Sequence, residues 1–206
     1  MSKKTKRILL VSASEIEMLS IGNPAVDMLV TSVGMVATSH ALTLKLLEST
    51  YDLVVNIGIA GSFNSSFQIG AVAQVVTDKL VELGAEDNGS FIPANEMNLI
   101  ESNQMIFKTG LRVLGLLEAS GITVNRVHGS ANSIMQVKGQ FNPDIESMEG
   151  AAVAYVCEQM NVPWVQIRAI SNLVEPRNKD AWNIPLALKN LHKEVESYLT
   201  ELLNEA

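Results

Sequence analysis

The chain has 206 residues, of which 47% are hydrophobic and 18% are charged, and its formal net charge is −7. This length suffices for one substantial domain and does not require two. The negative charge disfavours a nucleic-acid backbone or an anionic membrane surface as the main partner, so we expect a small-molecule ligand.

The start of the chain and its cysteine content indicate a cytoplasmic protein. The apolar run Ile8 to Val11 follows basic residues but is too short for the hydrophobic region of a secretion signal. No apolar stretch approaches the roughly 20 residues that a membrane span needs. The only cysteine, Cys157, excludes an intramolecular disulfide, and its place in an alanine-rich segment favours core packing over nucleophilic chemistry.

Apolar runs in the first part of the chain predict alternating strands and helices. Ile8 to Val11 and Met28 to Thr31 predict two buried strands, and the helical spacing of apolar residues from Gly34 to Leu47 predicts a helix. Leu53 to Ile57 predicts a third strand that runs directly into Gly58-Ile59-Ala60-Gly61-Ser62. A glycine-rich exit from a strand lets backbone approach a ligand closely.

Cofactor and metal signatures are missing from the sequence. The glycine-rich segment matches neither GxGxxG nor a GK[ST] ending, so we expect no dinucleotide or phosphate-binding loop and no cofactor. The three histidines, His40, His128 and His192, are scattered, so we expect no metal site.

The middle of the chain is harder to interpret. Gly70 to Val81 predicts a long strand, and residues 87–90, Asp-Asn-Gly-Ser, predict a turn. Pro93 to Lys108 is more polar, and we expect it to form a loop that enters a helix over Met105 to Ala119.

The last part of the chain completes an alternating pattern. Ile122 to Val127 predicts a strand, and His128 to Ser133 predicts a polar loop after it. Ile145 to Asn172 contains a small-residue helix and, from Trp164, an apolar strand; Ala181 to Leu203 predicts an amphipathic helix. This alternation predicts an α/β fold with a mainly parallel sheet, and the apolar composition fits a sheet covered on both faces.

Polar loops follow four of these apolar strands, and ligands in such sheets bind beyond the carboxyl ends of the strands. We expect one shared mouth that contains two carboxylates, Glu17 and Glu149, and the amide of Asn172. Glu149 alone has two readings, a functional acid or a helix-start residue favoured by the helix dipole. The four loops are 12–17, 58–62, 128–133 and 171–177.

Three motifs, in the expected order, resemble signatures of the purine nucleoside phosphorylase and nucleosidase superfamily. They are Asn56-Ile57-Gly58-Ile59-Ala60-Gly61, Met148-Glu149-Gly150-Ala151-Ala152 and Arg168-Ala169-Ile170-Ser171-Asn172, and Ser12 to Glu17 fits the loop after the family's first strand. The resemblance implies one domain over residues 1–206, a three-layer α/β/α fold with a twisted, mixed, mainly parallel sheet. It also implies a homodimer or a higher homo-oligomer that binds a purine nucleoside.

The positions of the arginines separate two reactions within this superfamily. Phosphorylases hold a phosphate nucleophile with arginines from early loops, a bidentate role that lysine fills poorly. After Arg7 this chain has no arginine until Arg112. The loop after the first strand instead carries Glu17, where related nucleosidases have the base that activates water. The resemblance therefore implies hydrolysis with Glu17 as a catalytic residue; the alternative is that Glu17 only starts a solvated helix.

Asn172 indicates which purine base the site accepts. Methylthioadenosine and adenosylhomocysteine nucleosidases end this motif in an aspartate that protonates N7 of the leaving adenine, whereas an amide can donate and accept but cannot deliver that proton. Asn fits a 6-oxopurine, and the motif with Arg177 and Trp182 resembles futalosine hydrolases. The resemblance implies hydrolysis of futalosine to hypoxanthine and dehypoxanthine futalosine, in menaquinone biosynthesis. The alternatives are a methylthioadenosine/adenosylhomocysteine nucleosidase, a purine nucleoside phosphorylase and a catalytically silent nucleoside-binding module.

The resemblance also assigns the substrate contacts. Glu149 would accept hydrogen bonds from the ribose hydroxyls, and Met148 would pack on the sugar. Arg177 would pair with the benzoate of futalosine and Trp182 would stack on its ring, although a helix-capping Arg and a docking Trp explain both equally well. The remaining predicted contacts are Ile59, Ala60 and Gly61 along the glycine-rich segment and Asn132 and Ser133 beside the base.

Overall fold

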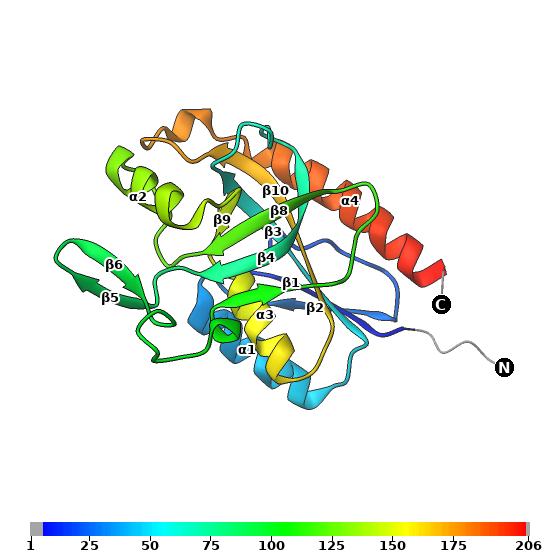
Figure 1. The fold of residues 1–206 in the computed structure, drawn as a ribbon. Coiled ribbons are helices and arrows are strands. Elements are labelled where there is room, and N and C mark those ends of the chain that lie inside the picture. The colour runs from blue at the N-terminus through cyan, green and yellow to red at the C-terminus, as the bar shows by residue number, and fades with distance from the viewer. Residues whose placement is uncertain (1–5, 205–206) are drawn as a thin grey trace.

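The structure is a computed structural model that describes residues 6–204. Most of the basic N-terminal segment, and both ends of the expected 1–206 domain, lie outside the described residues. In the described part the chain forms a mixed α/β fold (Figure 1).

One mixed sheet of eight strands organises the molecule, in the order β10-β4-β8-β9-β3-β1-β2, with β7 paired to β4. Five pairings are parallel and three are antiparallel, the latter being β10–β4, β3–β9 and β4–β7. The strands are β1 (Ile8–Ser12), β2 (Val26–Val30), β3 (Leu53–Ser62), β4 (Val72–Leu80), β7 (Ile106–Lys108), β8 (Leu117–Thr123), β9 (Ile145–Ser147) and β10 (Trp164–Leu173).

The long strand β3 holds the sheet together because it pairs with three others. Its first half pairs with β1, its last two residues pair with β9, and β10 runs alongside it from Val54 to Ser62. Since β10 also continues through β4 and β8 to β9, the path of pairings returns to β3. The ends of β3, β9 and β10 are thereby brought together.

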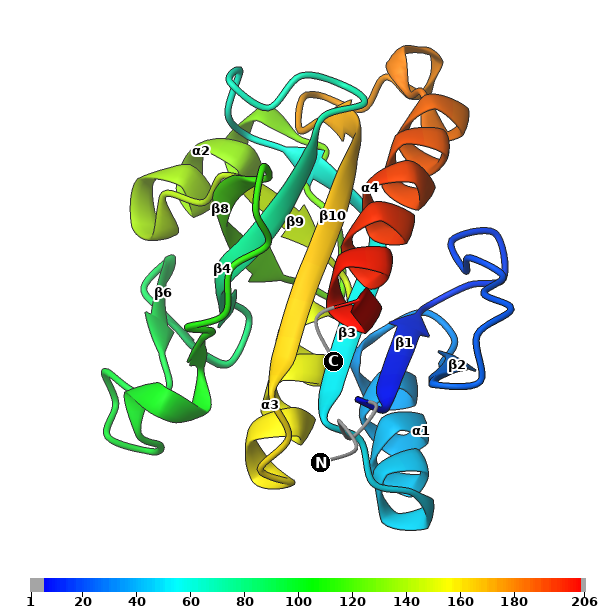
Figure 2. The ribbon, with the colours of Figure 1, turned by 90° about the vertical axis from the view of Figure 1, so that its right-hand side faces the viewer.

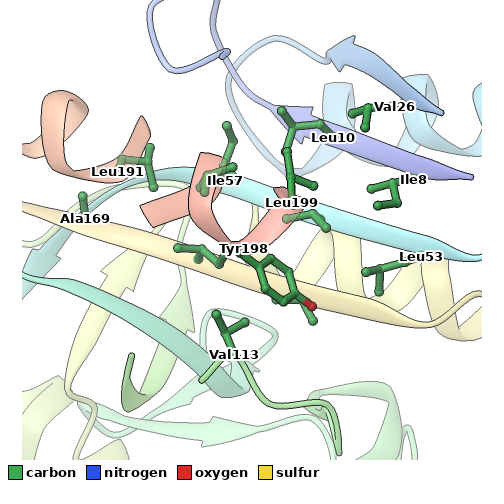
Figure 3. Packing of buried hydrophobic residues seen from close by; sticks show 14 of the residues in the cluster. Ile8, Leu10, Val26, Leu53, Ile57, Val113, Ala169, Leu191, Tyr198 and Leu199 are labelled. Carbon is green, nitrogen blue, oxygen red and sulfur yellow. The ribbon is translucent and has the colours of Figure 1, made fainter. Parts of the chain in front are cut away.

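Helices pack against both faces of this sheet. Helix α4 (Ile184–Asn204) runs along β10 and β3 (Figure 2), and its Leu191, Tyr198 and Leu199 pack with Leu10 and Ile57 in one buried cluster (Figure 3). Helices α1 (Met35–Glu48) and α3 (Gly150–Gln159) contribute to a second cluster with the alternate residues of β1 and β3. Such alternation is what a strand buried on both sides requires.

The remaining elements lie around this centre. Helix α2 (Ala131–Phe141) precedes β9, and two short 3₁₀ helices cover Ser102–Gln104 and Lys179–Ala181. Strands β5 (Gly84–Asp87) and β6 (Ser90–Pro93) form a separate hairpin, seen projecting at the left of Figure 1. The predicted turn at 87–90 is confirmed: Asn88 and Gly89 have φ of 48° and 81°, which suit a tight hairpin.

The helix predicted over Met105 to Ala119 was wrong. This segment forms β7, an irregular stretch and the start of β8, and both strands pair with β4. Gly110 and Gly115 interrupt the segment, and Gly115 has a φ of 82°, which ends any helical run. A short apolar run fits a buried strand as well as a helix, and here pairing with β4 decided the outcome.

Strands β3, β8 and β9 also differ from the sequence prediction. Strand β3 continues through the glycine-rich segment to Ser62, β8 ends at Thr123 and does not reach Val127, and β9 was not predicted. Gly58 lies inside β3 at a point where two side chains approach the backbone closely. A methyl group there would lie 2.7 Å from Nη1 of Arg168 and 2.9 Å from Oε1 of Glu17, so a glycine fits this position.

Candidate active site

A cavity of about 370 Å³ lies where the ends of β3, β9 and β10 meet. This volume is within the range usual for small-molecule sites. Most of the predicted site residues line it, namely Glu17, Ile59, Ala60, Gly61, Met148, Glu149, Asn172, Arg177 and Trp182. The structure therefore brings together three of the four expected loops and the start of α3.

Glu17 is held in the cavity wall by two hydrogen bonds. The Ser14 hydroxyl donates to Oε2 over 2.7 Å, and the backbone N–H of Ile59 donates to Oε1 over 3.1 Å. The residue is 8% exposed, which excludes the reading of Glu17 as part of a solvated helix. Both partners donate, so they fix a carboxylate that still has acceptor capacity towards the cavity.

Glu149 lines the cavity at the start of α3. It is the N-cap residue of α3, as its position predicted, but its side chain makes no capping bond and instead accepts from the Gly34 N–H over 2.9 Å. Burial raises the pKa of the Glu149 carboxyl above its usual range, while the positive charge of Arg168 opposes that shift. A carboxylate so placed has lost water and gains from a polar ligand in the cavity.

A buried arginine lies behind both carboxylates. Arg168 in β10 is 1% exposed and its Nη2 donates to Oδ1 of Asn56 in β3. Burial lowers the pKa of the guanidinium, and the charges of Glu149, Glu17 and Asp78 oppose that change. The arginine thus provides positive charge to the acidic side of the cavity without lining it.

Asn172 reaches the cavity because β10 has a bulge. The register against β3 shifts between Ile170 and Asn172, so Ser171 is the extra residue and both Ser171 and Asn172 face the cavity. The Ser171 hydroxyl donates to Oδ1 of Asn172 over 2.8 Å, and Nδ2 of Asn172 donates to the Leu173 carbonyl over 2.9 Å. These bonds fix the amide orientation and leave one N–H and one acceptor position unused.

Arg177 and Trp182 come together at the rim. The Arg177 guanidinium lies 5.4 Å from the centre of the Trp182 ring, in the range of a cation–π contact, and both residues line the cavity. The backbone N–H of Arg177 donates to the Gly129 carbonyl, which ties this segment to the loop before α2.

Asn132 and Ser133 do not line the cavity, contrary to the sequence prediction. The expected loop ends early because α2 begins at Ala131, and Ser130 caps it by accepting from the Ser133 N–H over 3.2 Å. Ser133 is therefore used at the helix start and Asn132 is exposed, while Val127 before this loop lines the cavity. A capping pattern, Ser at the N-cap followed by a polar Ser three residues on, was the available signal.

Sequence reasoning missed two residues of β9. Glu146 and Ser147 line the cavity and are buried, and the Ser147 hydroxyl has no hydrogen-bond partner in the structure. No sequence signal marked Glu146, because β9 reads Ile-Glu-Ser and its three residues are too few for a periodic pattern to show.

Another buried acid, Asp78, lies outside the cavity lining and is linked to the start of α3. Asp78 in β4 accepts from the Thr123 hydroxyl and from Nε2 of Gln166, each over 3.0 Å, and Thr123 in turn accepts from the Ala151 N–H at the start of α3. Burial raises the pKa of Asp78 to about 6. This network joins β4, β8 and β10 to the helix that carries Glu149.

Neither a metal-binding cluster nor a membrane-spanning helix is found among residues 6–204. No group of three or more His, Cys, Asp or Glu side chains there could hold a metal ion. Nor does that part of the chain contain a helix with the length and apolar character to cross a membrane.

The fold and the site together define a class of protein. A family model described as the phosphorylase superfamily matches residues 9–200, and the chain belongs to this superfamily. The resemblance indicated by the three motifs is confirmed.

Particular relatives narrow the comparison. The chain is 33% identical to a futalosine hydrolase from Acidothermus cellulolyticus, over 80% of this chain and 71% of that protein. It is 26% identical to a 5′-methylthioadenosine/S-adenosylhomocysteine nucleosidase from Haemophilus ducreyi, over 82% of this chain and 76% of that protein. A solved nucleosidase of the latter kind from Colwellia psychrerythraea, in complex with adenine, has a TM-score of 0.78 and 18% identity, covering 97% of this chain and 96% of that one.

Proposed function

We propose that the protein hydrolyses the N-ribosidic bond of futalosine, releasing hypoxanthine and dehypoxanthine futalosine. The observation that carries this proposal is the meeting of Glu17, Glu149 and Asn172 in one cavity of a chain 33% identical to a futalosine hydrolase. Cleavage of such a bond passes through a sugar that develops positive charge, with water on one side and the leaving base on the other.

Glu17 is the base that activates water. Its carboxylate is buried, held by two donated hydrogen bonds and open to the cavity, which is the geometry a general base needs. Glu149 accepts hydrogen bonds from the ribose hydroxyls and stabilises the developing positive charge of the sugar, and Met148 beside it packs on the ring and excludes water.

Asn172 binds the leaving base. Its unused N–H and acceptor position suit O6 or N7 of hypoxanthine. Arg177 pairs with the benzoate of the 5′ substituent and Trp182 stacks on the benzoate ring. The support is that the two side chains contact each other at the rim of the cavity.

A methylthioadenosine/adenosylhomocysteine nucleosidase is the second candidate, and the 26% identity to the Haemophilus ducreyi enzyme favours it. Asn172 argues against it because an amide cannot deliver a proton to N7 of adenine. A phosphorylase is disfavoured because Glu17 would repel phosphate in the cavity.

The deciding experiment is a phosphate-free assay of base release from futalosine, aminofutalosine, inosine and methylthioadenosine. We expect the highest kcat/KM for futalosine. Preference for methylthioadenosine would establish the second candidate, and dependence of turnover on added phosphate would establish a phosphorylase.

The wider organisation is also a proposal. We propose a single three-layer α/β/α domain over residues 1–206, which the packing of helices on both sheet faces supports. We propose a cytoplasmic location, in line with a single, buried cysteine, Cys157. We propose a homodimer or larger assembly; exposed apolar side chains such as Val36, at 84% exposure, and Val33 at the cavity mouth support it.

A further inference from the structure

Glu146 is a buried acid that the proposed mechanism does not use. It lies in the middle of β9, is 3% exposed and lines the same cavity as Asn172. Burying a carboxylate costs free energy unless the group is paired and hydrogen-bonded. The partners of Glu146 therefore indicate what this acid is for.

Both hydrogen-bond partners of Glu146 belong to one residue, His128. The backbone N–H of His128 donates to Oε1 over 3.0 Å, and the ring Nδ1 lies 2.6 Å from Oε2. The His128 ring is held in turn by an edge-on contact with Phe63, at 6.0 Å between ring centres. The carboxylate is thus fixed in orientation, and each oxygen keeps an acceptor position.

Glu146 and Asn172 lie on two sides of Gly61. A methyl group in place of the Gly61 hydrogen would lie 3.2 Å from Nδ2 of Asn172 and 3.6 Å from Cγ of Glu146. Glu146 is also the direct partner of Gly61 in the β3–β9 ladder. Cγ2 of Val174 lies nearer still, at 2.9 Å, so a side chain at residue 61 would meet all three neighbours. Because residue 61 is a glycine, the Asn172 amide and the Glu146 side chain can both line the same cavity beside it.

This pairing matches one edge of a 6-oxopurine. Hypoxanthine presents a donor at N1 beside an acceptor at O6, whereas adenine presents an acceptor at N1 beside donors on N6. A carboxylate can only accept, so it pairs with N1–H and repels the bare N1 of adenine. We propose that Glu146, oriented by His128, binds N1–H of the purine while Asn172 binds O6 or N7, so that Glu146 is a second determinant of 6-oxopurine specificity.

The inference rests on the proposed nucleosidase function, and its test uses free bases so that the two can fail separately. Calorimetry would give the Kd values of hypoxanthine, 1-methylhypoxanthine and adenine for the wild type and for Glu146→Gln. We expect the wild type to bind hypoxanthine about 10- to 100-fold more tightly than 1-methylhypoxanthine, the range of a hydrogen bond to a charged group. Glu146→Gln keeps an oxygen that can accept but removes the negative charge, so it should weaken hypoxanthine binding and reduce the penalty for methylation.

Glu82→Gln is the matched control. Glu82 likewise accepts from a backbone N–H, that of Asn125, but is exposed and does not line this cavity. It should leave all three Kd values unchanged. His128→Phe, which keeps the carboxylate but removes its ring donor, should give an intermediate loss, and a melting temperature for each variant checks folding.

The wild-type comparison needs no variant. Equal affinity of the wild type for hypoxanthine and 1-methylhypoxanthine, or no measurable hypoxanthine binding, would overturn the inference. So would a methylation penalty in folded Glu146→Gln that is as large as in the wild type. If the Kd values follow the expected pattern but futalosine is not turned over, Glu146 is still the residue that binds N1–H, and only the proposed substrate is wrong.

Discussion

Three acids share one buried cation at the centre of the molecule. Glu17, Glu149 and Asp78 all raise the pKa of Arg168 against the effect of its burial. The two acids that reach the cavity differ in their partners, because Glu17 accepts from a hydroxyl and an N–H whereas Glu149 accepts from backbone groups, among them the Gly34 N–H. The two bonds to Glu17, one to each carboxylate oxygen, orient this side chain, as a base for water must be oriented.

Replacing Glu17 by Gln tests this assignment. The amide oxygen can still accept from the Ile59 N–H, but the side chain can no longer take a proton. We expect kcat to fall by roughly 10²- to 10⁴-fold, the usual contribution of a general base, while the Kd for hypoxanthine stays nearly constant. Glu15→Gln, at an exposed position two residues earlier, is the control. Normal turnover by a folded Glu17→Gln protein would remove Glu17 as the base.

Asn172→Asp tests whether the amide sets the preference for a 6-oxopurine over a 6-aminopurine. An aspartate at this position can carry a proton to N7 and so restore what a 6-aminopurine requires, while losing the N–H that suits a 6-oxopurine. The ratio of kcat/KM for futalosine to that for aminofutalosine should fall by roughly tenfold or more, the scale of one hydrogen bond to a charged group. Asn98→Asp adds the same charge at an exposed position and should leave the ratio unchanged. Unaltered selectivity in Asn172→Asp would contradict the role of the amide.

At the level of elements, the sequence predicted the site where a polar residue follows a recognisable strand. Glu17 and Asn172 come after strands that their apolar residues indicated, so both the strands and their meeting point were predictable. Glu146 was not, because β9 has three residues and is defined by its pairing with β3 and β8. The helix prediction for residues 105–119 was wrong for the same reason: the strands there are specified by pairing with β4, whose residues are distant in sequence.

The start of α3 depends on a glycine that the sequence motif contains but does not explain. A methyl group at Gly150 would lie 2.2 Å from both Oδ2 of Asp78 and Nε2 of Gln166. We expect Gly150→Ala to lower the free energy of unfolding by about 1–3 kcal/mol, the usual cost of overpacking, and to displace Glu149. Chemical denaturation would measure the first effect and kcat/KM the second.

Gly139→Ala provides a control of opposite sign. Gly139 lies in α2 with no atom close to an added methyl group, so alanine there should stabilise the helix by about 0.5–1 kcal/mol. A stability unchanged by Gly150→Ala would show that the Asp78–Gln166 network yields easily.

For the molecule as a whole, the buried charges lie inside the closed path of strands. Arg168 and Asp78 are fully buried, and the hydrogen bonds of Asp78 reach β8, β10 and, through Thr123, the start of α3. Strands β4, β8 and β10 and helix α3 are therefore joined through polar groups as well as through apolar packing. Breaking such a network costs more than any single bond within it.

The pH dependence of stability should report Asp78. Its pKa is raised by burial from 3.8 to about 6 in the folded protein, so the unfolded chain loses this proton first as pH rises. Its contribution to folding is thus complete below pH 3.8 and declines until pH about 6, by about 3 kcal/mol from the size of the shift. Asp78→Asn removes this titration, and a flip of the Gln166 amide would let its unpartnered Oε1 accept from the new amide.

Denaturant unfolding of Asp78→Asn and the wild type from pH 4 to pH 7 measures this difference. The variant should gain stability relative to the wild type between pH 4 and pH 6, and the gap should be constant above that. Asp87→Asn, at an exposed position in the β5–β6 hairpin, should follow the wild-type curve. Parallel curves for Asp78→Asn and the wild type would mean that the positive charge of Arg168 offsets the burial of Asp78, and that the two behave as one ion pair across the whole range.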